Sequence, residues 1–174
     1  GAAALARYLV SGGGPLGDAG MEACAFVKSD SALAEPDIKL LLVMALYANN
    51  GRELSPHHGF AAHTNVIRPV SRGSVRLASA NPLDAPLIDQ NYLASADDWR
   101  IARAAVRTAR EVFAQKAFDA LRGEELEPGP GIRSDAEIDA FIRARAEADY
   151  HSVGTCRMGQ DELAVVDERL RVRG

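Results

Sequence analysis

Residues 38–47 form the segment that most restricts how this chain can fold. Lys39 is the only charged residue among them, and all the others are apolar or aromatic. Such a run is typical of a buried strand or a buried helix, and its periodicity does not separate the two. The turn-forming residues around it, Pro36 before and Asn49-Asn50-Gly51 after, favour a strand that is covered on both faces.

Three other segments predict strands. Residues 22–28, 60–68 and 73–78 combine short length with alternating or concentrated apolar side chains. The connection between the last two contains Pro69 and Gly73 and has the length of a hairpin loop. We therefore expect segments 60–68 and 73–78 to pair with each other in antiparallel fashion.

Helices are predicted for residues 2–10, for a segment that begins near Ser95, and for a segment from Ser134 to about Asp149. The last begins with a Ser-x-x-Glu capping box that includes Glu137. In the second, apolar residues at steps of three and four predict a buried face: Trp99, Ala102, Val106, Ala109 and Phe113. A neighbouring stripe consists of Arg100, Arg103, Arg107 and Arg110. Because charged side chains normally face water, we expect this stripe to be a solvated face in preference to a site for a substrate anion.

Composition argues against several functional classes. The 174 residues are 47% hydrophobic and 25% charged, as in ordinary globular proteins, and no apolar run is long enough to span a membrane. The net charge of −4 gives no electrostatic reason to expect a nucleic-acid partner. The two cysteines, Cys24 and Cys156, form no CxxC pair, so neither a disulfide framework nor a zinc site is predicted, and we expect a cytoplasmic protein. His57 and His58 are neighbours in a predicted loop and do not have the spacing of convergent metal ligands.

The start of the chain suggests a piece of a longer protein. It begins at Gly1 inside a predicted helix, its first methionine is Met21, and no signal-like segment precedes the helix. The glycines at 12–14 follow a helix and precede Pro15, so they predict a linker, because a dinucleotide-binding loop would follow a strand.

The segment Tyr150-His151-Ser152-Val153-Gly154-Thr155-Cys156-Arg157-Met158-Gly159 places a histidine beside small and flexible residues. On the residues alone, His151 has two interpretations, a hydrogen-bonded structural residue or a general base. The predicted helix before it would hold it in a fixed position.

This segment and four others resemble the C-terminal part of the glucose–methanol–choline (GMC) family of flavin oxidoreductases, with choline-dehydrogenase-like members most similar. The other segments are residues 68–77, 91–93, 114–118 and 134–138, in the order that the family has them. One departure is Ser152, where the family usually has proline, so that this loop is less restricted in its backbone.

The resemblance implies an α+β fold, an antiparallel sheet flanked by helices, with the FAD-binding domain largely absent. It implies that His151 is the catalytic proton acceptor beside the flavin, and that Gly154 and Thr155 lie near the cofactor. The family's FAD fingerprint and its second active-site residue, a His or Asn, are not in the sequence. We therefore expect FAD in the intact protein, none bound to this chain alone, and no turnover by this chain alone.

By the same resemblance, residues 1–35 lead into the domain, residues 36–159 form the substrate-binding domain, and residues 160–174 begin the return to the FAD-binding domain. The partners we expect are a small alcohol and the missing FAD-binding domain. Surface that this domain would cover also predicts self-association of the isolated chain.

The substrate is not specified by the sequence. Choline would require a carboxylate or an aromatic cage around its cation, and the predicted strand at 38–47 offers only Tyr47. Leu40, Leu42 and Met44 favour a small or apolar alcohol. Besides an alcohol dehydrogenase or oxidase, two alternatives stay open: a hydroxynitrile-lyase-like enzyme on the same scaffold, and a non-catalytic binding or assembly module.

Overall fold

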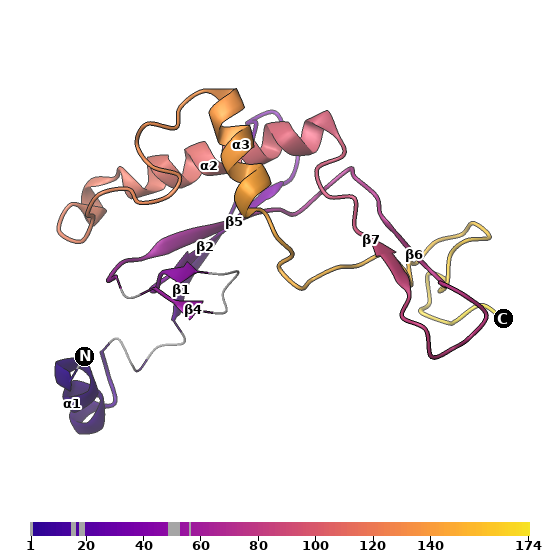
Figure 1. Ribbon diagram of the computed structural model, residues 1–174, viewed down its shortest axis with the longest axis horizontal. Helices are drawn as coiled ribbons and strands as arrows, with labels where there is room; N and C mark the ends of the chain where they lie inside the picture. Colours follow the sequence, from indigo (N-terminus) through magenta and orange to yellow (C-terminus); the bar gives the residue numbers. More distant parts are fainter. Residues whose placement is uncertain (1, 15–16, 18–19, 49–52, 56) are drawn as a thin grey trace. The chain divides into compact units, whose positions relative to one another are not determined.

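The computed structural model describes residues 2–14, 17, 20–48, 53–55 and 57–174 of the chain (Figure 1). The predicted turn at Asn49-Asn50-Gly51 and the residues Pro15 and Pro56 lie outside this description. The elements, in order, are α1 (Ala2–Ser11), β1 (Met21–Val27), β2 (Ile38–Val43), β3 (Tyr47–Ala48), β4 (Glu53–Leu54), β5 (Ala61–Val66), β6 (Ser74–Arg76), β7 (Leu87–Asp89), α2 (Ala96–Phe113), the 3-10 helix η1 (Lys116–Phe118) and α3 (Asp135–Arg145). This mixture of helices and antiparallel strands confirms the predicted α+β class.

The chain divides into two compact units. The first comprises Gly1–Pro69 and Ala96–Ala146, and the second comprises Val70–Ser95 and Glu147–Gly174. The boundaries predicted at residues 35 and 159 follow a different criterion, the placement of a flavin-binding domain, and stay a prediction.

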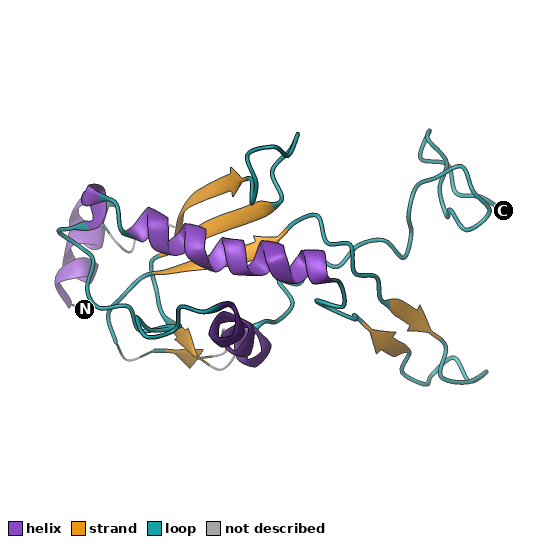
Figure 2. Cartoon of the chain, turned by 90° about the horizontal axis from the view of Figure 1, so that it is seen from above, coloured by secondary structure: helices purple, strands orange, loops and turns teal. Residues whose placement is uncertain are grey.

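A three-stranded antiparallel sheet, in the order β1-β2-β5, forms the centre of the first unit. α2 runs across one face of this sheet and packs on β2 and β5 (Figure 2). The core between them contains Ile38, Leu40, Ile101 and Ala105, all less than a tenth exposed. The apolar run at 38–47 is therefore a strand, as predicted, but it ends at Val43, and Tyr47 belongs to the separate strand β3.

The predicted hairpin between segments 60–68 and 73–78 is wrong. β5 pairs with β2, and β6 pairs with β7, a strand that the sequence did not predict. Apolar alternation identifies both segments as strands but carries no information about their partners. The intervening residues connect the first unit to the second, so they do not form a hairpin turn.

The arginine stripe of α2 is only partly a solvated face: Arg100 and Arg107 are exposed, as predicted, but Arg103 and Arg110 are not. Arg103 donates to both carboxylate oxygens of Asp139 on α3, at 2.9 and 3.1 Å, and both side chains are about four-fifths buried. Arg110 donates to Glu125 and to the carbonyl oxygens of Gly129 and Ile132. These arginines join α2 to α3 and to the loop before it, which a helix that faced only water would not require.

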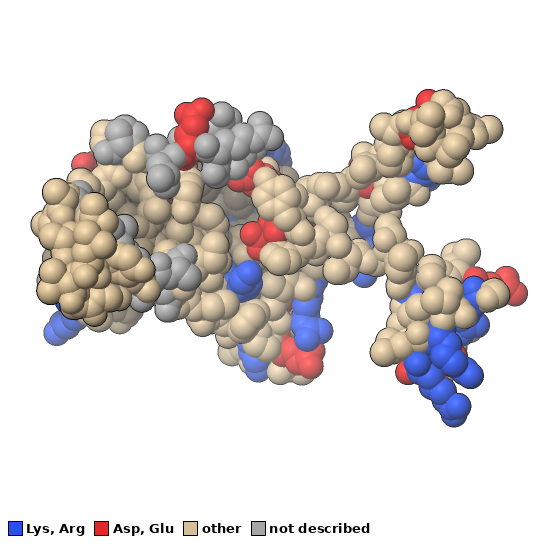
Figure 3. Space-filling model, turned by 90° about the horizontal axis from the view of Figure 1, so that it is seen from below, with Lys and Arg blue, Asp and Glu red and all other residues tan. Residues whose placement is uncertain are grey.

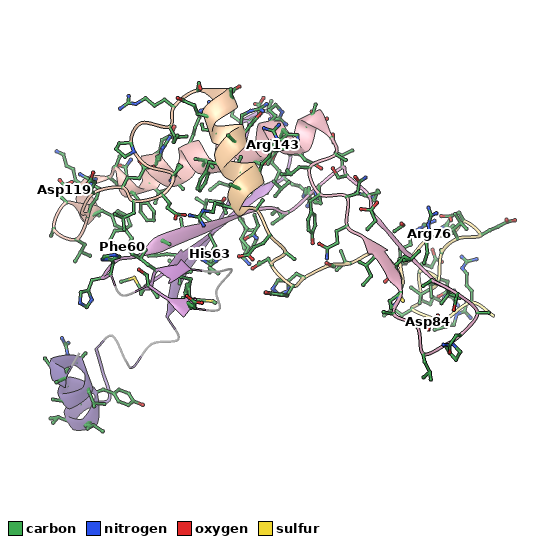
Figure 4. All side chains as sticks on the ribbon, viewed as in Figure 1. Phe60, His63, Arg76, Asp84, Asp119 and Arg143 are labelled. Carbon is green, nitrogen blue, oxygen red and sulfur yellow. The ribbon has the colours of Figure 1, made fainter. Side chains whose placement is uncertain are left out.

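Aromatic contacts stabilise the C-terminal end of α2. The ring centroids of Phe60, Phe113 and Phe118 lie 5.1 to 5.7 Å apart, at separations and inclinations typical of aromatic pairs. Figure 4 labels Phe60, which lies just before β5. The cluster ties the start of β5 to the end of α2 and to η1.

α3 begins as predicted and ends earlier than predicted. Ser134 accepts from the Glu137 backbone N–H, and the Glu137 carboxylate accepts from the backbone N–H groups of Arg133 and Ser134, which completes the capping box. These bonds, from Arg133 and then Ser134, lower the pKa of Glu137 to about 2. The helix ends at Arg145, with Ala146 already in an extended conformation, and not near Asp149.

The second unit contains the β6–β7 hairpin and the C-terminal segment. Ser74, Val75 and Arg76 pair with Asp89, Ile88 and Leu87. At the tip, Asp84 accepts from the Ser79 hydroxyl at 2.5 Å and from the Asn81 amide at 2.8 Å. In the C-terminal segment, single bridges join Val166 to Met158 and to Val172.

Candidate functional site

The candidate site residue His151 lies on an exposed loop of the second unit. Every side chain from Tyr150 to Met158 is exposed, and Val153 is 95% exposed. Among the described residues, none forms a hydrogen bond or ion pair with the His151 ring. Because α3 ends at Arg145 in the first unit, the helix does not hold His151 as the sequence suggested. The imidazole is thus accessible to a ligand.

The backbone of this loop contains two residues with positive φ. Tyr150, directly before the histidine, has a φ of 57°, and Gly154 has a φ of 112°. The value at Gly154 is one that side chains with a Cβ rarely adopt, which explains the glycine there. A Cβ added at Gly154 would meet no described atom within 4 Å. The conformation, and not crowding within this chain, therefore requires glycine.

The C-terminal end of the loop is anchored within the second unit. Arg157 forms a two-point ion pair with Asp161, and its hydrogen bond lowers the pKa of Asp161 to about 2. The Gly159 N–H donates to the Val166 carbonyl at 3.1 Å, and Arg173 donates to the Gly159 carbonyl at 2.8 Å. The loop is thus fixed from Arg157 onward, while the side chains of residues 150–156 are exposed to solvent.

These residues suit a planar cofactor on geometric grounds. Gly154 offers bare backbone with open space around it, and Thr155 adjoins it on the same exposed turn. An aromatic ring system can approach backbone most closely where no Cβ intervenes. Gly154 and Thr155 therefore fit the role of flavin contacts that the resemblance implies.

Tyr47, the predicted substrate-pocket residue, lies in the first unit and is 47% exposed. Its ring makes an edge contact with the ring of His63 on β5, with centroids 6.5 Å apart (Figure 4). Leu40, which we expected to favour an apolar alcohol, is only 6% exposed because it packs in the core. It does not line a pocket wall, and that part of the substrate argument is wrong.

Sequence reasoning missed His63. Directly opposed residues in an antiparallel sheet share a face, so the pairs Cys24–Leu41 and Leu41–His63 place His63 on the sheet face opposite α2. The ring is exposed there. The alternation within segment 60–68 already separated His63 from its neighbours on the core side, and this signal could have identified it.

Metal binding and membrane insertion find no support in the described residues. Within them, no group of three or more His, Cys, Asp or Glu side chains is placed to hold a metal ion, and His57 and His58 are exposed. The described helices also include none with the length and apolarity needed to cross a bilayer.

Comparisons with known proteins identify the family to which the chain is similar. The profile of the GMC oxidoreductase C-terminal domain matches residues 69–174. The chain is 44% identical to an oxygen-dependent choline dehydrogenase of Rhizobium johnstonii over 97% of its length, and 44% identical to one of Brucella ovis over 88% of its length. It spans only 31% and 28% of those two relatives.

Two solved structures have similar folds. Pyridoxine 4-oxidase from Mesorbium loti superposes with a TM-score of 0.76 at 30% identity, over 88% of this chain and 30% of the other. Formate oxidase from Aspergillus oryzae superposes with a TM-score of 0.75 over 98% of this chain and 34% of the other, but at 23% identity it supports the fold alone. With more than half of its residues matched by the family profile, the chain belongs to the GMC oxidoreductase family.

Proposed function

We propose that this chain is the substrate-side portion of an FAD-dependent alcohol dehydrogenase or oxidase, in which His151 accepts the proton of the substrate hydroxyl. The observation that carries the proposal is the family segment around His151 on an exposed, glycine-containing loop. An unprotonated imidazole nitrogen suits this step, since it can accept a proton directly from a hydroxyl group within hydrogen-bond reach.

The residues around His151 have distinct roles in this proposal. Arg157, fixed by Asp161, holds the C-terminal end of the loop. Gly154 would offer bare backbone to the flavin, and Thr155 a hydroxyl. FAD, when bound, supplies the chemistry of accepting hydride from the alcohol carbon. His151 removes the hydroxyl proton. Without this proton transfer, the alcohol carbon does not become a carbonyl carbon.

The remaining length of the parent protein supplies what this chain lacks. Because the chain spans less than a third of its choline-dehydrogenase relatives, we propose that the rest includes the FAD-binding part and the second active-site residue. The accessible His151 ring supports this view, since a catalytic imidazole needs partners that fix its orientation. On this account, the isolated chain binds no flavin and does not turn over.

Choline becomes the first substrate to test. The case for an apolar alcohol is weaker because Leu40, one of the three residues that favoured it, is a core residue. The 44% identity to an oxygen-dependent choline dehydrogenase supports the same choice.

Anaerobic flavin reduction in the full-length protein tests the proposal. Choline should bleach the bound flavin, and an uncharged alcohol of similar size should do so more slowly. Bleaching by the uncharged alcohol alone would support the oxidoreductase proposal and contradict choline as the substrate. A flavin that stays oxidised with all alcohols offered would contradict the oxidoreductase proposal and favour lyase-type proton transfer.

A further inference from the structure

Val153 is the most exposed of the large apolar side chains that the structure describes, at 95%. It lies two residues after His151, in the loop segment 150–156, which contains no Asp, Glu, Lys or Arg. Exposed apolar side chains are common in proteins, and the tan atoms of Figure 3 show that uncharged surface is common on this chain too. Exposure alone therefore assigns Val153 no role, but its position beside His151 is more specific.

The backbone between His151 and Val153 is extended. These residues form no helix, turn or bend, and neither they nor Ser152 between them have the positive φ of Tyr150 or Gly154. In extended backbone, side chains two residues apart point to the same side, and two residues span about 7 Å. The side chain of Val153 therefore lies on the same side of the loop as the His151 imidazole.

This placement brings Val153 within reach of a molecule that is bound to His151. Proton transfer from a substrate hydroxyl requires the hydroxyl oxygen to lie about 3 Å from a nitrogen of the His151 ring. The carbon atoms of a small alcohol extend beyond that oxygen, so an apolar side chain about 7 Å along the loop can contact them. Such a contact would cover the methyl groups of Val153, which the rest of the described chain leaves bare.

We propose that Val153 contacts the substrate carbon next to the alcohol carbon and limits the size of the substituent that this carbon can carry. The inference rests on the proposed function, because it requires the hydroxyl to be bound at His151. Val153 transfers no proton or hydride and determines specificity by its shape alone. One methyl group more or less in an apolar contact changes the selectivity of an enzyme by about 10- to 200-fold.

The test compares two alcohols that differ by one methyl group, in the full-length protein. The probes are choline and choline with a methyl group on the carbon next to its hydroxymethyl group, or n-propanol and isobutanol if only uncharged alcohols bleach the flavin. The quantity measured is the ratio of their second-order rate constants for anaerobic flavin reduction, larger alcohol over smaller. We expect this ratio to rise by about tenfold or more in Val153→Ala and to fall by a similar factor in Val153→Leu.

The matched control is Val10→Ala. Val10 is also a valine, is 89% exposed and lies in the first unit, so its truncation should leave the ratio unchanged. A purely structural effect of the Val153 substitutions would change both rate constants by the same factor and would likewise leave the ratio unchanged.

Two results would overturn the inference. An unchanged ratio in both Val153 variants, at unchanged flavin content, would show that Val153 does not contact the substrate. Loss of flavin from both variants, with an unchanged ratio in the protein that retains it, would assign Val153 to the cofactor instead. The proposed function fails separately, through normal flavin reduction by His151→Ala, and the ratio between the two alcohols would still report on Val153.

Discussion

Arg110 offers the most informative test of how the first unit is held together. Its side chain, 26% exposed, lies on α2 and donates to Glu125 and to the carbonyl oxygens of Gly129 and Ile132. A single guanidinium thus fixes a loop that contains no helix or strand of its own. Replacing Arg110 with alanine leaves the Glu125 carboxylate, 31% exposed, without this charge partner.

The expected cost of Arg110→Ala follows from these contacts. Hydrogen bonds to charged groups contribute about 1.5–3 kcal/mol each and are not additive, and partial exposure of both partners reduces the effect. We expect a loss of about 2–3 kcal/mol in the local stability of the loop. The matched control is Arg107→Ala, because Arg107 and its partner Asp135 are 45% and 63% exposed. An exposed pair of this kind contributes about 0–1 kcal/mol.

The assay is native-state hydrogen exchange at the Ile132 amide, which donates to the Gly129 carbonyl within the same loop. A loss of 2–3 kcal/mol corresponds to exchange about 30- to 150-fold faster, since each 1.36 kcal/mol is a factor of ten. In Arg107→Ala, the Ile132 amide should change by less than about sixfold. Equal acceleration in the two variants would refute the claim that the buried arginine contacts, and not charge in general, hold the loop.

Three further predictions concern the core of the first unit, the capping box of α3 and the loop that contains Gly154. Ile38→Ala should lower the stability of the first unit by about 2–5 kcal/mol in urea unfolding, because Ile38 is fully buried, and a cost below that range would mean that the core is not packed as described. Hydrogen bonds from the backbone N–H groups of Arg133 and Ser134 lower the pKa of Glu137 from 4.5 to about 2. The stabilising effect of the Glu137 carboxylate is therefore complete above pH 4.5 and is lost as the pH falls towards 2. Glu137→Gln should remove that pH dependence from amide exchange in the first turn of α3, and an unchanged profile would argue against it. In the full-length protein, Gly154→Ala should reduce flavin content or turnover, since a Cβ at this φ costs about 1–3 kcal/mol, whereas Gly129→Ala, with a φ of 94°, should leave both unchanged.

Local features of the fold were predictable from the sequence. The strand predicted at 38–47 was confirmed over 38–43, and the capping box at Ser134 was confirmed, because each depends on neighbouring residues alone. Strand partners were not predictable, as the incorrect hairpin after Pro69 shows. Pairing depends on which distant segment offers a complementary face, and alternation within one strand does not contain that information.

The arginine stripe illustrates a second limit. A charged stripe normally faces water, but the acidic residues that cover this one, Glu125, Asp135 and Asp139, lie 15 to 36 residues away in sequence. For the candidate site, the motif identified His151 as the residue of interest, but the helix thought to support it ends six residues before the histidine. His63 was overlooked although the alternation within segment 60–68 separates it from the core side; only its placement on the sheet face opposite α2 depends on the strand register.

The central claim is that His151 accepts the substrate proton in the intact flavoprotein. The direct measurement is the rate constant of anaerobic flavin reduction in the full-length protein carrying His151→Ala, compared at matched flavin content with His57→Ala, which removes an exposed loop histidine of the first unit. Loss of a general base should lower this rate constant by about 10²- to 10⁴-fold in His151→Ala, while His57→Ala behaves as the unmodified protein. Unchanged reduction by His151→Ala, at unchanged flavin content, would contradict the account and leave His151 with a structural role only.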